Sequence, residues 1–426
     1  MSRRGTIRGR REPNPRAERA AWAADRMNLN RVMPAQGKDL ILPDIRPQKT
    51  REPLDAIVIG AGVIGLSIAW RAAQRGLRVR VLERSETGSG ASGVAAGMLA
   101  PVGEATWGEE DLLQAALASH RMWPEFAGEL AGLDGGAPPL VRHGALHVAL
   151  DADEAGELRR RFDLMRSLGL EAQWLSGREC RDLEAGLGPS VYGGVHAPHE
   201  AGVDPAAIVR ALRTTCEGAG VEILTGANVV GALWEGEALC GVVTDGGEEH
   251  WGSATVLAAG AWSGSINWLP EAALPPVRPV KGQILTLRGP ASAPVAEQIV
   301  VTERVYLVPR RDGRLIAGAT VEEMGFDSRV TAGGVYELLR EAYRALPDIA
   351  ELELVQSVVG HRPGTPDNAP IVGRSAIEGL VFATGHFRNG VLLAPLTAEC
   401  VAALLANDEE PTDFRVADPA RFAKVS

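Results

Sequence analysis

The sequence has few cysteines and histidines, and neither residue type occurs in a metal-binding pattern. The 426 residues include four cysteines, which are far apart and form no CxxC pair, and eight histidines, which form no HExxH motif. Zinc sites and disulfide frameworks of the common spacings are therefore excluded. We predict no metal ion, free thiols and a cytoplasmic location, because scattered cysteines suit a reducing compartment.

The sequence also lacks a long hydrophobic run and an overall basic charge. No uninterrupted apolar segment approaches the roughly 20 residues that span a bilayer, so we predict no association with a membrane. The net charge is −10, although residues 1–53 carry 13 Lys and Arg against 6 Asp and Glu, so the rest of the chain is strongly acidic. An acidic body argues against nucleic-acid binding.

Residues 1–53 form a basic arm without the apolar core of a signal peptide. We expect this arm to be disordered. A targeting segment or a tether to a partner is the alternative, although Glu12 and Glu18 do not suit a transit peptide.

After the arm, the sequence has a clear strand–helix–strand pattern. The segment DAIVIG, residues 55–60, is short, apolar and β-branched, which predicts a buried strand. Residues 63–76 repeat apolar side chains at helical spacing and end at a glycine, and RVRVLER, residues 78–84, predicts a second strand. Such a βαβ unit indicates a parallel sheet and an α/β fold.

A GxGxxG motif, formed by Gly60, Gly62 and Gly65, lies between the first strand and the helix. In such a motif the glycines allow a tight turn, close approach of a pyrophosphate, and packing of helix on strand. Glu83 ends the second strand, where a carboxylate accepts a hydrogen bond from a ribose 2′-hydroxyl and disfavours NADP. We predict dinucleotide binding, and the motif alone leaves NAD and FAD open.

Two further segments favour FAD. GSGASG, residues 88–93, directly follows the acidic strand, and its hydroxyls and amides suit the pyrophosphate and flavin of an extended cofactor. VLAAGAWS, residues 256–263, is a strand that runs into a glycine turn, as expected where backbone passes close to a ligand. Either segment alone is typical of an ordinary loop, but together they predict a long, buried cofactor.

The order of the elements predicts a cofactor domain interrupted by a substrate domain. We assign residues 54–101, 200–268 and 356–410 to the FAD-binding domain. Residues 102–199 and 269–355 are assigned to the substrate-binding domain, and residues 411–426 to a C-terminal tail.

Five segments resemble the D-amino-acid oxidase superfamily of FAD enzymes, and within it the glycine oxidases of thiamine biosynthesis. They are DAIVIGAGVIGLSIAW, GSGASGVAAGML, VYLVPRRDGRLIAGAT, HRPGTPDNAPIVG and GHFRNGVLLAP. The resemblance covers roughly residues 54–405. It implies a Rossmann-like FAD-binding domain of the GR2 type, with an interleaved α+β substrate domain built on a mixed sheet.

The resemblance also implies a substrate site. The family binds the substrate carboxylate with arginine and a tyrosine hydroxyl, and the matching positions are Tyr306, Arg362 and Arg388. The alternatives are that Arg388 is a surface residue, that Arg362 pairs with Asp367, and that Tyr306 belongs to the core.

The resemblance further implies a set of FAD contacts, with the helix after Asn389-Gly390 directing its N-terminus toward the flavin. These contacts are Gly60, Gly62, Val63, Ile64, Gly65, Glu83, Arg84, Ser89, Ala91, Ser92, Gly97, Met98, Val229, Ala259, Gly260, Arg388, Asn389, Gly390 and Val391. Some relatives attach flavin to a cysteine before the last strand. The corresponding segment here, HRPGTPDNAPIVGRS, has no cysteine, so we expect noncovalent FAD.

The implied activity is oxidative deamination of glycine and other small amines or D-amino acids to imino or keto acid, ammonia and hydrogen peroxide. Amino acid and oxygen are the expected partners, in a homo-oligomer that serves thiamine thiazole synthesis. The alternatives are a quinone-linked D-amino-acid dehydrogenase, a sarcosine-type oxidase, an NAD-dependent dehydrogenase and a non-catalytic flavoprotein.

Overall fold

The computed structural model describes residues 54–134, 140–408 and 412–422. The chain divides into two units, residues 1–52 and 53–426, and the described residues belong to the second. The basic arm predicted for residues 1–53 lies outside the described residues.

The first of two large sheets is built on the predicted βαβ unit. Its strands follow the order β17-β18-β11-β1-β2-β8, and the neighbours from β18 to β8 run parallel. β17 is antiparallel to β18, and the β9–β10 hairpin extends from β11. The bounds are β1 Leu54–Ile59, β2 Val79–Glu83, β8 Glu222–Thr225, β9 Val229–Glu235, β10 Ala238–Thr244, β11 Glu249–Leu257, β17 Ile371–Arg374 and β18 Leu380–Thr384.

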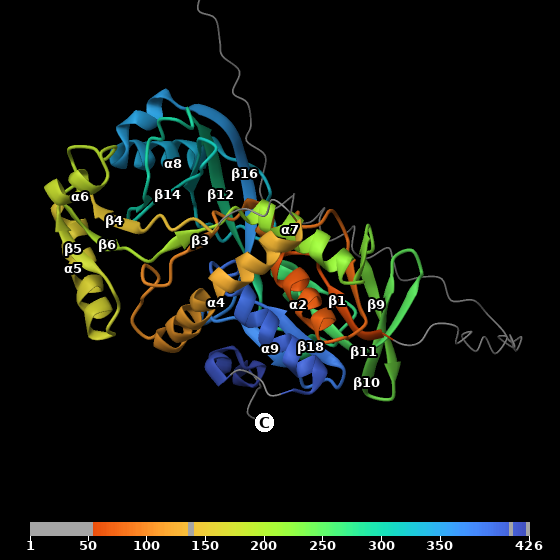
Figure 1. The fold of residues 1–426 in the computed structure, drawn as a ribbon. Helices are drawn as coiled ribbons and strands as arrows, with labels where there is room; N and C mark the ends of the chain where they lie inside the picture. The colour runs from red at the N-terminus through yellow and green to blue at the C-terminus, as the bar shows by residue number, and fades with distance from the viewer. Residues whose placement is uncertain (1–53, 135–139, 409–411, 423–426) are drawn as a thin grey trace, which may run out of the picture. The chain divides into compact units, whose positions relative to one another are not determined.

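Four helices cover one side of this sheet, and Figure 1 shows them grouped together. They are α2 Val63–Gln74, α4 Glu110–Asp134, α7 Pro205–Gly218 and α9 Ala394–Ala406. In α7, the Asp204 side chain caps the helix by accepting a hydrogen bond from the Ala207 amide at 3.2 Å, as the Asp-Pro pair at its start favours. Apolar side chains of all four helices form one buried cluster with the sheet.

The second sheet is mixed and has the order β16-β12-β15-β14-β13-β4-β6-β5. β13 and β4 are parallel, and the other neighbours are antiparallel. The bounds are β4 Ala145–Ala149, β5 Gln173–Ser176, β6 Gly193–Ala197, β12 Arg278–Arg288, β13 Ile299–Val301, β14 Tyr306–Pro309, β15 Arg314–Gly318 and β16 Glu353–Gly364. The predicted α/β fold with a parallel sheet and a second, mixed sheet is thereby confirmed.

Shorter elements complete the second sheet and its connections to the first. Helix α8 packs on β12 and β15, and α5 and α6 lie beside β4, β5 and β6 (Figure 1). Their bounds are α3 Ala91–Val94, α5 Ala152–Ser167, α6 Gly177–Leu183, α8 Ala332–Ala345, β3 Met98–Leu99, β7 Ala201–Gly202, and the 3-10 turns Gly260–Ser265, Glu271–Ala273, Pro347–Glu351, Thr412–Ala417 and Pro419–Phe422.

Two elements depart from the predicted division into domains. Helix α4 comes from a segment assigned to the substrate domain, but its Trp123 and Phe126 are buried with Trp70 of α2 in the core of the first sheet. Strand β16 crosses the predicted boundary at residues 355–356 and pairs along its length with β12 of the second sheet. The division as a whole stays a prediction.

Candidate functional site

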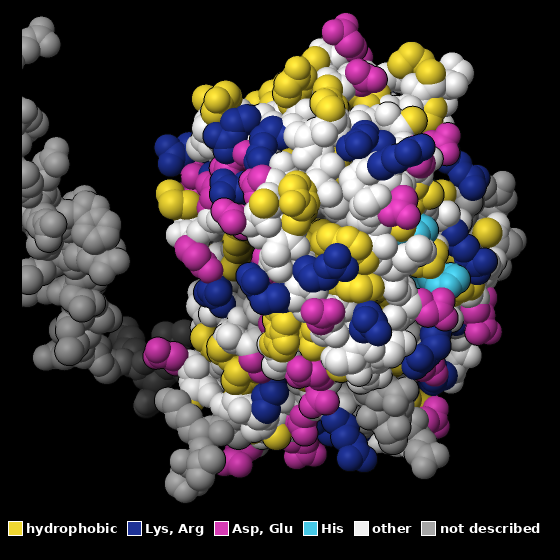
Figure 2. Space-filling view, turned by 90° about the vertical axis from the view of Figure 1, so that its left-hand side faces the viewer, with side chains coloured by type: hydrophobic (Ala, Val, Ile, Leu, Met, Phe, Trp, Pro, Cys, Tyr) yellow, Lys and Arg dark blue, Asp and Glu magenta, His cyan; other side chains and the backbone are white. Residues whose placement is uncertain are grey.

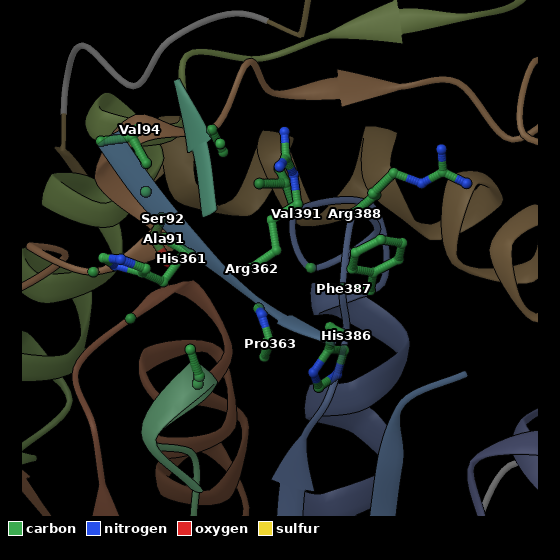
Figure 3. Close-up of a pocket in the computed structure, with 18 of the residues that line it drawn as sticks. Ala91, Ser92, Val94, His361, Arg362, Pro363, His386, Phe387, Arg388 and Val391 are labelled. Carbon is green, nitrogen blue, oxygen red and sulfur yellow. The ribbon is translucent and has the colours of Figure 1, made fainter. Parts of the chain in front are cut away.

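A cavity of approximately 940 Å³ is lined by residues of both sheets. The first sheet contributes the turns at the carboxyl ends of β1, β2, β11 and β18, the edge at which parallel α/β sheets bind ligands. The second sheet contributes side chains of β4, β12, β14 and β16. Figure 3 shows part of this lining. The volume lies near the upper end of the range of about 300–1,000 Å³ typical of ligand sites.

Of the predicted site residues, all but Gly65 line this cavity. They are Gly60, Gly62, Val63, Ile64, Glu83, Arg84, Ser89, Ala91, Ser92, Gly97, Met98, Val229, Ala259, Gly260, Tyr306, Arg362, Arg388, Asn389, Gly390 and Val391. Gly65 lies against the strand instead, since a Cβ placed there would come within 1.9 Å of the Gly60 carbonyl oxygen. It permits helix packing and does not touch the cavity.

The turn after β1 requires glycine for conformation and for space. Gly60 has a φ of +107°, and a Cβ placed there would lie 2.5 Å from the Ala258 carbonyl oxygen. The backbones after β1 and β11 are therefore in direct contact at one wall of the cavity. A side chain at Gly60 would force these two turns apart.

The Glu83 carboxylate is held in place at the end of β2. One of its oxygens accepts a hydrogen bond from the Ala61 amide at 2.8 Å, and the other accepts one from the Ser85 amide at 2.9 Å. These bonds join Glu83 to the glycine turn and leave acceptor capacity on both oxygens, since each carboxylate oxygen has two lone pairs. The carboxylate is thus fixed where the sequence places a ribose hydroxyl.

The predicted glycine-serine loop closes on the start of α2. The Ser92 hydroxyl accepts a hydrogen bond from the Val63 amide at 3.0 Å. Gly97, with a φ of +70°, ends this loop against the Val203 carbonyl, which a Cβ would approach within 2.1 Å. The loop therefore lines the cavity along one side of the helix N-terminus.

Tyr306 and Arg362 lie together on the second sheet. Burial raises the pKa of Tyr306, although the neighbouring Arg362 guanidinium acts to lower it. Two glycines on adjoining strands leave room for these side chains. A Cβ at Gly318 would lie 2.6 Å from the Tyr306 hydroxyl oxygen, and a Cβ at Gly282 would lie 2.3 Å from Arg362 Nη1.

Arg388 lines the cavity, but its guanidinium is directed elsewhere. Figure 3 shows the side chains of Arg362 and Arg388 diverging. Arg388 forms an ion pair with Glu104 at 3.2 Å, and 47% of its side chain is exposed. Arg362 does not pair with Asp367, which binds Arg421 at 2.8 Å. The structure therefore brings Tyr306 and Arg362 together and leaves Arg388 bound to an acidic residue.

The two histidines next to these arginines differ in their surroundings. His386 is buried, and its Nε2 lies 2.9 Å from the Thr397 hydroxyl in α9. Burial lowers the pKa of His386 to about 3, so the ring is neutral at physiological pH. His361 Nε2 lies 3.2 Å from the Asp327 carbonyl oxygen. Both histidines are engaged by neighbouring protein groups.

Several cavity residues were not predicted from the sequence. Trp262 carries the Arg84 guanidinium over its ring at 3.9 Å, and Glu104 faces Arg388. Gly282 and Gly318 were missed because a glycine in a strand is a weak signal until its neighbours across the sheet are known. His147 was missed because it reads as one residue of an ordinary buried strand.

Other kinds of site are not evident in the part of the chain that the structure describes. No group of three or more His, Cys, Asp or Glu residues there is arranged to hold a metal ion. No cysteine lines the cavity. Between residues 54 and 422, leaving aside the undescribed gaps, no helix is long and apolar enough to cross a bilayer.

The residues present fit FAD. The lining runs continuously from Val229 and Glu83, at the nucleotide end, past the Gly60–Gly62 turn to Arg362 on the second sheet. Positions where a Cβ would fill or close the space are glycines. Fold and site together are those of a dinucleotide-dependent oxidoreductase, with an arginine and a tyrosine on the part of the cavity wall that the second sheet forms.

A sequence model of the family described as "DAO: FAD dependent oxidoreductase" matches residues 55–404. The chain belongs to this family, which confirms the predicted resemblance and the predicted cofactor, FAD. It is 37% identical over 353 residues to "Bifunctional protein ThiO/ThiG" of Trichormus variabilis, covering 82% of this chain and 52% of that protein. The chain thus spans about half the length of the first curated relatives it matches.

Two glycine oxidase comparisons cover nearly the whole of the relative. The chain is 34% identical over 363 residues to the glycine oxidase of Geobacillus kaustophilus, covering 84% of this chain and 95% of that enzyme. The crystal structure titled glycine oxidase from the same organism superposes with a TM-score of 0.81, covering 87% of this chain and 99% of that one.

Proposed function

We propose that the protein is an FAD-dependent amine oxidase that deaminates glycine and other small amines or D-amino acids, in the service of thiamine thiazole synthesis. The observation that carries this proposal is the pair formed by Tyr306 and Arg362 at the end of an FAD-type cavity. The similarity to glycine oxidases supports the choice of substrate. The products are imino or keto acid, ammonia and hydrogen peroxide.

Arg362 and Tyr306 would bind the substrate carboxylate. The guanidinium offers two parallel donors to a carboxylate and neutralises its charge. The raised pKa of Tyr306 keeps the phenol protonated, so it donates a further hydrogen bond. Bound FAD supplies the two-electron oxidation of the substrate and passes the electrons to oxygen. The protein's contribution is to hold the amino acid in one orientation.

Arg388 is proposed as the third group at the carboxylate site. In the structure its charge is already compensated by Glu104. A substrate carboxylate would have to replace Glu104 as its partner. The neutral, buried His386 is not positioned as a general base, so the amine is proposed to react in its neutral form.

Noncovalent binding of FAD is proposed because no cysteine lines the cavity. Burial also raises the pKa of the Cys180 thiol to about 11 and that of Cys216 to about 12, which removes their nucleophilic thiolate form at physiological pH.

A homo-oligomer is proposed because β16 ends the second sheet, and its Leu354 and Val355 are exposed. Absence of nucleic-acid binding is proposed from the acidic charge, and a cytoplasmic location from the scattered cysteines, which suit a reducing compartment. On the face shown in Figure 2, Lys and Arg side chains are intermingled with Asp and Glu and form no continuous basic track.

The test is anaerobic addition of glycine to the purified holoenzyme, followed by air. Bleaching of the visible flavin absorbance, and then peroxide release, is expected for glycine, with sarcosine and D-alanine as the other members of the panel. Absence of bleaching by every amine would contradict the proposed function. Bleaching without peroxide in air would favour the quinone-linked alternative. The Arg362→Ala variant with bound FAD is the control for site-specific turnover.

A further inference from the structure

Lys281 is an unusual residue in this chain. Four of the 44 basic side chains are lysines, and Lys281 is the one lysine between residues 54 and 422. It lies in β12 and is 0% exposed. A buried ammonium group is costly unless it is paired. A chain that uses arginine almost everywhere else has a lysine, whose charge is compact, at this fully buried position.

The partners of Lys281 come from the segment between β15 and α8. Its Nζ lies 3.0 Å from Asp327 Oδ2 and 3.3 Å from Glu322 Oε2. Burial acts to lower the pKa of Lys281, but the bonds to these two carboxylates more than offset it, so the pKa is raised. The neighbouring Gly282 lines the cavity and Lys281 does not, as expected for alternating residues of a strand. Lys281 therefore acts from behind the cavity wall.

Glu322 connects Lys281 to Thr320. Its Oε1 accepts hydrogen bonds from the Thr320 hydroxyl at 2.6 Å and from Gln283 Nε2 at 2.7 Å. The Thr320 hydroxyl in turn accepts a hydrogen bond from the backbone amide of Gln283 at 2.8 Å. Backbone bonds between Lys281 and Glu322, at 2.9 and 3.0 Å, hold the segment against β12. Thr320 is also held at its backbone, where its amide donates a hydrogen bond to the Gln283 carbonyl oxygen at 3.2 Å.

The backbone carbonyl of Thr320 links this segment to Arg362, which lines the cavity. It accepts a hydrogen bond from Arg362 Nη1 at 3.0 Å. A second route runs from Lys281 through Asp327, whose carbonyl oxygen lies 3.2 Å from Nε2 of His361, the residue preceding Arg362. The guanidinium therefore takes its orientation from the segment that Lys281 anchors.

We propose that Lys281 is a positioning residue for substrate binding: through Glu322 and the Thr320 carbonyl, it holds the Arg362 guanidinium in the orientation that receives the substrate carboxylate. This inference rests on the proposed function for the identity of the carboxylate. Lys281 itself does not line the cavity. Its loss should weaken carboxylate binding and leave the oxidation step largely intact.

The test uses two matched pairs of variants. Lys281→Met is compared with Arg278→Met, because Arg278 also lies in β12 and pairs with the same segment, through Glu323 at 3.0 Å. Glu322→Gln is compared with Glu323→Gln, because these neighbours differ in their connection to Thr320. For each holoenzyme, acetate binding is titrated by the change in flavin absorbance, and KM and kcat for glycine are measured separately.

Lys281→Met and Glu322→Gln are expected to raise the Kd for acetate and the KM for glycine by about tenfold or more, with kcat within about threefold of the wild type. Arg278→Met and Glu323→Gln should bind acetate as the wild type does. Equal acetate affinity in all variants would overturn the inference, and so would equal losses in both members of each pair.

Misfolding of a variant and failure of the proposed function can both be distinguished from failure of the positioning role. If Lys281→Met does not yield a folded holoenzyme, Glu322→Gln decides the question, because it keeps Lys281 paired with Asp327. If wild-type enzyme binds acetate but no amine bleaches the flavin, the proposed function fails. The acetate titrations still test the positioning role in that case, since acetate has no amine to oxidise.

Discussion

At the scale of single residues, the part of the cavity around Tyr306 and Arg362 depends on two neighbouring positions that have no side chain. Gly318 pairs with Tyr306 across the sheet, and Gly282 lies diagonally opposite Arg362. A Cβ at either glycine would occupy the space of the neighbouring functional group. The Arg362 guanidinium and the Tyr306 phenol thus lie directly over the backbone of these glycines. Adding one methyl group, by replacing either glycine with alanine, should therefore move the Arg362 or Tyr306 side chain, although both residues are still present.

Gly282→Ala is expected to raise the KM for glycine and the Kd for acetate by about tenfold or more, because the flexible end of Arg362 has to move aside. The fold and FAD content should be retained. Gly128→Ala is the control, since a Cβ at that helical position meets no atom within 4 Å. Steady-state kinetics of the two variants check the prediction, and unchanged KM in Gly282→Ala would contradict it.

The two arginines are expected to contribute unequally. Arg362→Ala should raise KM by about 100-fold, the loss typical of a charge-assisted hydrogen-bonded pair. Arg388→Ala should raise it by about tenfold, because Glu104 competes with the substrate for that guanidinium. Glu104→Gln should therefore lower KM. If neither Arg388→Ala nor Glu104→Gln changes KM, Arg388 is a surface residue that binds no substrate.

At the scale of secondary structure, local patterns predict the cofactor half of the site and miss much of the substrate half. The GxGxxG turn and Glu83 depend on neighbours in sequence, so their positions at the cavity follow from spacing. The register that sets Gly282 beside Arg362 joins β12 to β16 across some 80 residues and has no local signature. The packing of α4 on the first sheet likewise depends on contacts between residues that are far apart in the sequence.

The turn between β18 and α9 contains a pH-sensitive contact. His386 is neutral when folded, with its pKa lowered to about 3 by burial, whereas an unfolded histidine titrates near its ordinary value of about 6.5. Below that value the unfolded chain binds a proton that the folded chain does not. The contribution of His386 to the free energy of unfolding is thus fully present above pH 6.5. As the pH is lowered below that value, the contribution decreases by about 1.4 kcal/mol per pH unit.

His386→Gln keeps a polar group near Thr397 but cannot titrate. The melting temperature of the wild type is expected to fall more steeply between pH 7 and pH 5 than that of the variant, because the other ionisable groups are common to both. Parallel pH profiles would show that His386 is protonated or exposed in the folded protein.

At the scale of the whole described unit, FAD would lie where two separately cored sheets face each other. The first sheet has its own buried cluster with α2, α4, α7 and α9, and the second has another with α8. A ligand that contacts both sheets binds the folded state and stabilises it by mass action. Removal of FAD should therefore weaken the packing of the two sheets against each other more than it weakens the packing within either hydrophobic core.

A noncovalently bound cofactor should be removable, and its removal should lower the stability of the protein. Acid or heat precipitation of the holoenzyme should release the yellow colour into the supernatant, because no cysteine lines the cavity. Apoprotein prepared separately under non-denaturing conditions should melt at a lower temperature and recover as FAD is added, with about 2.7 kcal/mol regained at a hundredfold excess over Kd. Riboflavin, which lacks the pyrophosphate that the Gly60–Gly62 turn is proposed to bind, should restore far less. Colour retained in the pellet would show a covalent link, and equal rescue by riboflavin would remove the glycine turn from the cofactor site.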